Sequence, residues 1–189
     1  MNKISASRTM IHPLQFALWI GIGSIVMMFM ALTSAYIVRQ AAGNWLEFKL
    51  PSIFLLSTFA ILLSSVTLQM SKAAFKKGQE KSYKLMLLST LALGILFILF
   101  QYKGWMDMEA SGILMDGNPS GSFVYVLSGL HAAHVLGGIA ILCTAVYHAF
   151  SLPFQPTEKR ILRLNLTAQY WHFVDVLWVY LLIFFMIQR

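Results

Sequence analysis

Long runs of apolar residues alternate with short polar stretches along the chain. Five runs of about 20 residues are each long enough to cross the roughly 30 Å hydrocarbon core of a bilayer as a helix. Backbone polar groups in lipid must be paired within their own segment, so each run is predicted to be an α-helix. The expected fold is all-α, a polytopic membrane protein with a single five-helix bundle over residues 1–189. The predicted helices cover residues 14–38, 53–70, 85–102, 123–150 and 168–187.

The composition supports a membrane protein and excludes several classes. Hydrophobic residues make up 58% of the chain and charged residues 11%, whereas a soluble domain has roughly 45–50% apolar and about 25% charged residues. A soluble fold of this size could not bury so much apolar surface. A soluble enzyme, a disordered chain and a nucleic-acid-binding protein are therefore excluded.

The basic residues predict the orientation in the membrane. The N-terminal tail and the second and fourth connections together hold ten Lys and Arg residues, and the other side holds four. Because Lys and Arg collect on the cytoplasmic side, the N-terminus is predicted in the cytoplasm and the C-terminus outside. The net charge of +7 thus reflects topology, with possible contacts to anionic lipid.

Two pairs of ionisable residues interrupt the apolar runs. His131 and His134 lie in the fourth predicted helix, and His172 and Asp175 lie in the fifth. The spacing of three residues places each pair on one helix face. Ionisable residues inside a membrane face protein or a water-filled cavity. The favoured interpretation is a structural polar network in which Asp175 and His172 hold the fifth helix to the fourth through His131 or His134.

Other interpretations of these four residues stay open at this point. They could bind a metal ion, since imidazole and carboxylate suit zinc, iron or copper, or two histidines could hold a b-type haem. A proton relay is a third alternative, and a small transporter is an alternative from a different class. The chain shows no phosphate loop, no nucleophile beside a base and no paired acids. Catalysis by this chain is therefore uncertain.

Three tryptophans fall at or near the ends of predicted helices. Indole rings favour the membrane–water interface. Trp45, Trp105 and Trp171 are therefore predicted to be interfacial anchors.

Two motifs resemble a known family. The sequence S-G-L-H-A-A-H-V-L-G-G at 128–138 is followed about 30 residues later by Y-W-H-F-V-D-V-L-W at 170–178. Together they resemble subunit III of the haem–copper terminal oxidases, the cytochrome c oxidase subunit III family. Shorter stretches support the resemblance over residues 20–187, including Ala35-Tyr36 and L-L-S-S-V-T at 62–67.

The resemblance implies the short, five-helix form of the subunit in a bacterial inner membrane. It implies a non-catalytic subunit of the aerobic respiratory chain that packs beside subunit I, supports O₂ reduction to water and helps proton uptake. Haem and copper would belong to the partner subunits I and II, with no cofactor and no metal in this chain. Structural phospholipid would be bound, and a respiratory supercomplex is a possible further partner.

One departure limits what the resemblance implies. Family members often carry Ser-Glu early in the helix that ends in Ala-Tyr, and the matching positions here are Ser24-Ile25. A proton-related role of that glutamate is therefore not transferred to this chain. A quinol oxidase subunit and the subunit III-like protein of nitric oxide reductase remain alternatives.

Overall fold

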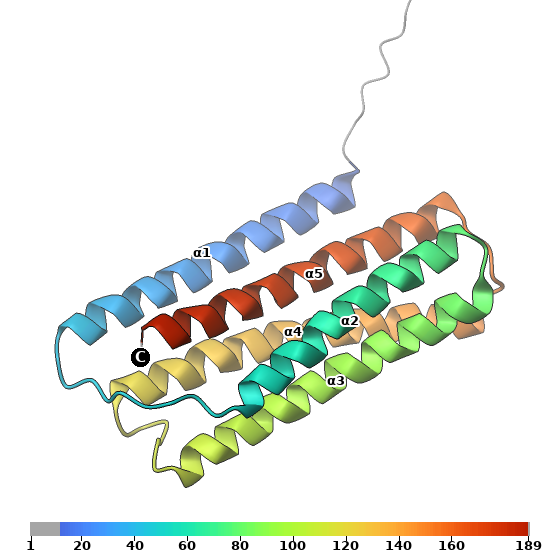
Figure 1. Ribbon diagram of the computed structural model, residues 1–189. Helices are drawn as coiled ribbons and strands as arrows, with labels where there is room; N and C mark the ends of the chain where they lie inside the picture. Colours follow the sequence, from blue (N-terminus) through green and yellow to red (C-terminus); the bar gives the residue numbers. More distant parts are fainter. Residues whose placement is uncertain (1–11, 189) are drawn as a thin grey trace, which may run out of the picture.

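Five long antiparallel helices form the fold in a computed structural model that describes residues 12–188 (Figure 1). All five are long and apolar enough to cross a membrane, as the sequence predicted. The topology counts included Lys3, Arg8 and Arg189, which lie outside the described residues. The helices are α1 (Pro13–Ala41), α2 (Ile53–Lys76), α3 (Glu80–Ala110), α4 (Pro119–Ser151) and α5 (Glu158–Ile187).

Every helix is longer than predicted, although α2 begins at the predicted Ile53 and α5 ends at the predicted Ile187. The predicted span 85–102, for example, corresponds to a helix that covers Glu80–Ala110. An apolar run stops at the first charged residue, but the backbone ladder continues until a residue breaks it. The turn after α2 contains Gly78, whose φ is +75°. Glycine suits this position because that conformation is costly for residues with a Cβ. Asn118 caps α4 by accepting a hydrogen bond from Ser120 N at 3.0 Å, just before Pro119.

The packing order places α5 in the middle of the bundle. It contacts α1, α2 and α4, while α3 packs against α2 and α4 (Figure 1). The α2–α3 turn and the α4–α5 connection lie at the same end, which we call the basic end because seven basic residues gather there: Lys76, Lys77, Lys81, Lys84, Lys159, Arg160 and Arg163. Placement of this end in the cytoplasm stays a prediction.

Helix α1 is attached to the bundle through its second half. Its buried residues are Phe29, Thr33 and Tyr36. The Tyr36 hydroxyl donates to Gln188 O at 3.2 Å, and the Tyr180 hydroxyl donates to Thr33 Oγ1 at 3.1 Å. No residue from Pro13 to Met28 is buried. The bundle therefore holds α1 at the end opposite the basic end and leaves its first half loosely packed.

Candidate functional site

His131 lies in the centre of the helix bundle. Its side chain is fully buried, and neither ring nitrogen has a hydrogen-bond partner within residues 12–188. The ring packs against Trp178, with centroids 5.2 Å apart, and meets the edge of Phe97 at 5.8 Å. His131 thus contributes to an aromatic cluster between α3, α4 and α5.

His134 points toward a different neighbour. Its Nδ1 lies 2.7 Å from Leu130 O on its own helix, and the ring meets the edge of Phe29 on α1 at 5.8 Å. One turn of α4 therefore presents its two histidines to separate surroundings, because a step of three residues still rotates the side chain by about 60°.

The second pair faces α2. His172 Nδ1 forms a short contact with the Ser65 hydroxyl. Asp175 is 2% exposed, and neither carboxyl oxygen has a hydrogen-bond partner among the described residues, although Ser65 lies beside it. The structure joins neither residue to His131 or His134. The expectation that His172 and Asp175 hold α5 to α4 is wrong. The residues of α5 that contact α4 include Tyr170 and Trp171, which come just before His172.

These four positions do not form a cluster suited to a metal ion. Within residues 12–188, no three His, Cys, Asp or Glu side chains come together as a potential ligand set. Their separation follows from the packing, since His131 and His134 face different helices and His172 is paired with a serine.

Tryptophan and tyrosine side chains make the contacts that hold α5 in place. Trp171 Nε1 donates to Ser64 Oγ at 2.9 Å, and Trp178 Nε1 donates to Thr58 Oγ1 at 2.8 Å, both on α2. The Tyr170 hydroxyl donates to His134 O on α4 at 3.0 Å. The motif at 170–178 thus supplies helix-to-helix hydrogen bonds from its aromatic residues, a role that sequence reasoning missed.

The prediction that Trp171 is an interfacial anchor is wrong. It is fully buried halfway along α5. Two glycines leave room for its ring, Gly94 on α3 and Gly138 on α4. A Cβ added at Gly94 would lie 2.8 Å from the indole ring, and one at Gly138 would lie 2.9 Å from it. Both positions therefore need glycine to make room for the ring.

The other two tryptophans lie partly exposed, near helix ends. Trp105 Nε1 donates to Ser128 Oγ at 2.9 Å. Trp45 packs against Tyr36, with ring centroids 4.6 Å apart, in the connection between α1 and α2. Both also join segments of the bundle, and their role as anchors stays a prediction.

Loss of the Trp171 acceptor gives a first testable prediction. Ser64→Ala leaves the buried indole N–H unpaired, and hydrogen bonds between membrane helices contribute about 1 kcal/mol. We expect the free energy of unfolding in detergent to fall by about that amount. Ser89→Ala is the control, because the Ser89 hydroxyl bonds to Leu85 O on its own helix. An equal loss in both variants would contradict the assigned role of Ser64.

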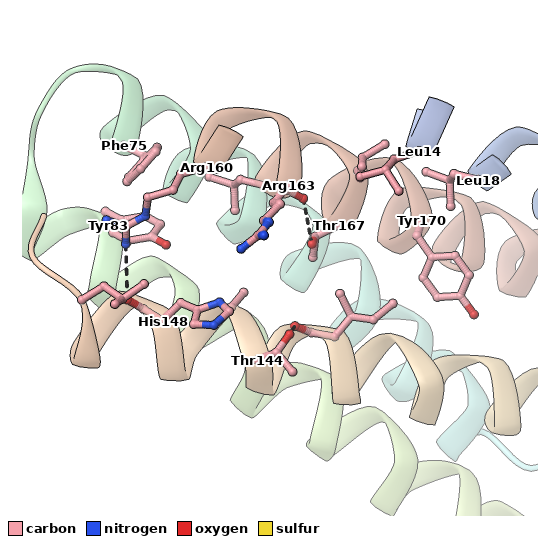
Figure 2. A pocket seen from close by; sticks show the side chains of 15 residues that line it. Leu14, Leu18, Phe75, Tyr83, Thr144, His148, Arg160, Arg163, Thr167 and Tyr170 are labelled. Carbon is pink, nitrogen blue, oxygen red and sulfur yellow. Dashed lines mark hydrogen bonds between the residues drawn. The ribbon is translucent and has the colours of Figure 1, made fainter. Parts of the chain in front are cut away.

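A cavity of about 690 Å³ opens at the basic end between α1, α4 and α5 (Figure 2). Leu14 and Leu18 on α1 face Ile141 and Ala145 on α4, so most of the wall is apolar. Polar side chains also line the cavity. His148, Arg160 and Arg163 lie near the basic end of the bundle, and Thr144, Thr167 and Tyr170 lie further from that end.

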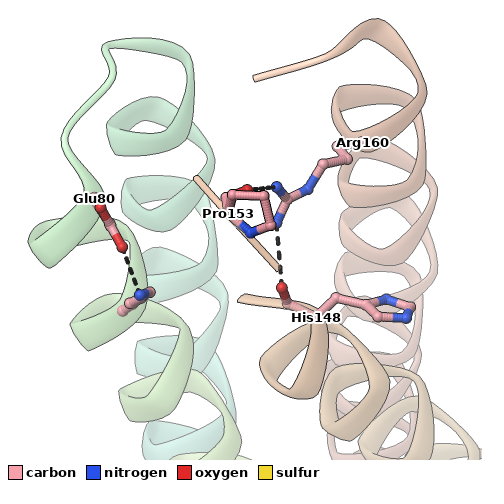
Figure 3. Close-up of polar contacts among 5 residues, drawn as sticks. Glu80, His148, Pro153 and Arg160 are labelled. Carbon is pink, nitrogen blue, oxygen red and sulfur yellow. Dashed lines mark hydrogen bonds and ion pairs between the residues drawn. The ribbon is translucent and has the colours of Figure 1, made fainter. Parts of the chain in front are cut away.

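The two arginines at this cavity have different surroundings. Arg160 Nη1 donates to Pro153 O at 2.6 Å and Nη2 donates to His148 O at 3.3 Å, so its guanidinium closes the end of α4 (Figure 3). Arg163 is exposed. Lys84 with Glu80 is the one ion pair formed within residues 12–188 (Figure 3). Both arginines therefore lack a carboxylate partner in the part of the chain that the structure describes.

Comparison with known proteins identifies the family. The family model for cytochrome c oxidase subunit III matches residues 7–188. Cytochrome c oxidase subunit 3 of Corynebacterium diphtheriae is 26% identical over 196 residues, covering 96% of this chain and 94% of that protein.

Two other relatives widen the comparison. Cytochrome c oxidase subunit 3 of Loxodonta africana is 35% identical over 127 residues, covering 67% of this chain and 47% of that protein. A protein of Staphylococcus saprophyticus named probable quinol oxidase subunit 3 is 26% identical over 170 residues, with 86% and 83% coverage. The five spanning helices and the bacterial relatives fit a multi-pass inner-membrane protein. The chain belongs to the cytochrome c oxidase subunit III family.

Proposed function

We propose that this chain is a non-catalytic integral subunit of a bacterial haem–copper oxidase. It supports subunit I in the reduction of O₂ to water and in the coupled uptake of protons. The observation that carries the proposal is the use of the motif at 170–178 for packing: its aromatic N–H and O–H groups bond to neighbouring helices. Haem and copper belong to subunits I and II in this proposal.

The test is a strain that lacks this chain. We expect its membranes to keep the haem spectrum of the oxidase, while O₂ consumption declines faster during sustained turnover than in the parent strain. Restoring the chain should restore the slower decline. Loss of the haem spectrum while subunit I remains in the membrane would contradict a supporting role, because the chain would then be needed to hold the haem itself.

A quinol-oxidizing complex is the second candidate, and the quinol oxidase relative favours it. The two candidates differ in the electron donor, which reacts with other subunits. Purified complex that oxidizes reduced cytochrome c but not a quinol would select the cytochrome c oxidase, and the reverse result would select the quinol oxidase.

We also propose that the cavity at the basic end holds a structural anionic phospholipid. Arginine binds phosphate through its fixed fork of N–H donors, and Arg163 reaches the cavity without a carboxylate partner in residues 12–188. The apolar walls on α1 and α4 suit acyl chains. Loose packing of the first half of α1 leaves room for them. The lipid would therefore fill the space between α1 and the rest of the bundle.

Arg163→Gln tests the proposed lipid site. We expect the affinity of the site for anionic phospholipid to fall about fivefold, because one basic residue contributes about 1 kcal/mol to headgroup attraction, so the purified complex should retain less of it. Lipid is counted by extraction and mass spectrometry. Lys103→Gln is the control, because it removes one exposed positive charge at the opposite end of the bundle. Equal lipid content in the two variants would contradict the site.

A further inference from the structure

The side chain of His148 lies at the basic end of the cavity between α1, α4 and α5. His148 is half-buried in the last turn of α4 and lines the cavity together with Arg163 of α5. Figure 2 shows the His148 ring and the Arg163 guanidinium pointing into the space between the two helices. Arg160 donates to the backbone carbonyl of His148 at 3.3 Å and not to its ring. An imidazole and a guanidinium therefore face the cavity from neighbouring helices.

The wall of this cavity can become more positive as the pH falls. None of its lining residues within 12–188 is acidic. The lining side chains that can gain or lose a proton are His148, Arg160, Arg163, Tyr83 and Tyr170. Between pH 5 and 8 guanidinium groups stay charged and phenols stay neutral, whereas imidazole ordinarily changes its charge in this range. His148 is thus the lining side chain that can change the charge of the cavity.

Other charged groups of the basic end lie outside the cavity wall. On α3, Glu80 pairs with Lys84 at 2.6 Å, and in Figure 3 the His148 ring extends away from Glu80. The lysines of the α2–α3 turn do not line the cavity, nor do Glu158 and Lys159 at the start of α5. A second imidazole, His12, precedes α1 and accepts a hydrogen bond from Leu14 N at 3.3 Å. It does not line the cavity either.

We propose that protonation of His148 strengthens the binding of an anionic phospholipid in this cavity. The charged imidazole on α4 then acts on the headgroup phosphate together with Arg163 on α5. The neutral imidazole leaves Arg163 as the free cation, because the Arg160 guanidinium is engaged by the carbonyls of His148 and Pro153. This inference rests on the lipid site given under the proposed function and adds its regulation by pH.

The direction of the effect follows from the charges. Protonation adds a positive charge to a site whose ligand is negative, so the lipid is held more tightly at pH 5.5 than at pH 7.5. Phosphatidylglycerol is a suitable probe, because its phosphodiester keeps one negative charge throughout this range. We expect about a fivefold difference in affinity, the factor that one basic residue contributes at a membrane surface.

The test titrates the purified complex in detergent with phosphatidylglycerol that carries a spin label on one acyl chain. The immobilised fraction of the label gives the dissociation constant at pH 5.5 and at pH 7.5. His148→Gln should bind equally at both pH values, with the affinity of the unaltered complex at pH 7.5. His148→Arg should also bind equally at both, with the higher affinity that the unaltered complex has at pH 5.5. Spin-labelled phosphatidylcholine, which has no net charge, is the control and should show no dependence on pH.

Three outcomes would overturn the proposal. They are equal affinity of the unaltered complex at the two pH values, the same pH dependence with phosphatidylcholine, and a pH dependence that persists in His148→Gln. The last result would assign the effect to another group such as His12. If phosphatidylglycerol binds no better than phosphatidylcholine at either pH, the lipid site itself fails. If phosphatidylglycerol is preferred equally at both pH values, only this inference fails.

Discussion

Trp171→Ala is expected to lower the free energy of unfolding by about 3–5 kcal/mol, the range for removing a large buried aromatic side chain. The indole ring is fully buried and rests against Gly94 and Gly138, so its removal leaves a cavity between α3, α4 and α5. Lipid tails are as apolar as the ring, and packing is therefore a main force that holds membrane helices together. Unfolding of the purified protein in mixed detergent micelles measures the loss.

Trp19→Ala is the control for this prediction. Trp19 on α1 is 47% exposed, and substitutions on a surface usually change stability by no more than about 0.5 kcal/mol. Trp171→Phe is a third variant, which keeps a ring and loses the hydrogen bond to Ser64. It should fall between the other two. A loss for Trp171→Ala no greater than that for Trp19→Ala would contradict the central position of this side chain.

Gly104→Val is expected to cost about 1–3 kcal/mol through overpacking. A Cβ at Gly104 on α3 would overlap the ring of Phe54 on α2. Phe54 is 1% exposed and packs against Trp178, with ring centroids 5.9 Å apart. The ring therefore has little room to move, and α2 and α3 must separate near the end opposite the basic end. The same unfolding measurement reports the loss.

Gly23→Val provides the matched control. A Cβ at Gly23 on α1 meets no heavy atom within 4 Å. Valine also has a higher helix propensity than glycine, so this variant should lose no stability. Comparable destabilisation at positions 23 and 104 would show that valine perturbs the helices themselves and not the contact with Phe54.

The positions of the helices could be predicted from the sequence, but most of their ends could not. Apolar runs mark the part of a helix that lies in hydrocarbon, and all five runs lie within observed helices. The first turns of α3 and α5 are charged, with Glu80 and Glu158 at their starts. Hydropathy ignores such turns because they lie outside the apolar core, whereas the backbone hydrogen bonds continue through them.

The rotation of each helix against its neighbours was the part that sequence could not provide. The spacing of His172 and Asp175 places both on one face but does not say which helix that face meets. Trp171 sets the rotation of α5, because its ring fits only where Gly94 and Gly138 leave space. These two glycines come from different helices, so no local pattern shows that they meet. The contact of His172 with Ser65 on α2 follows from that fit.

The most direct measurement purifies the complex through a tag on this chain and follows haem and copper before and after the chain is dissociated. We predict that haem and copper purify with the tagged chain in mild detergent and stay with the other subunits when it is removed. That result would show an integral oxidase subunit without a redox centre of its own. Haem or copper that stays with the isolated chain, or a tagged chain that brings down no haem protein, would contradict the account.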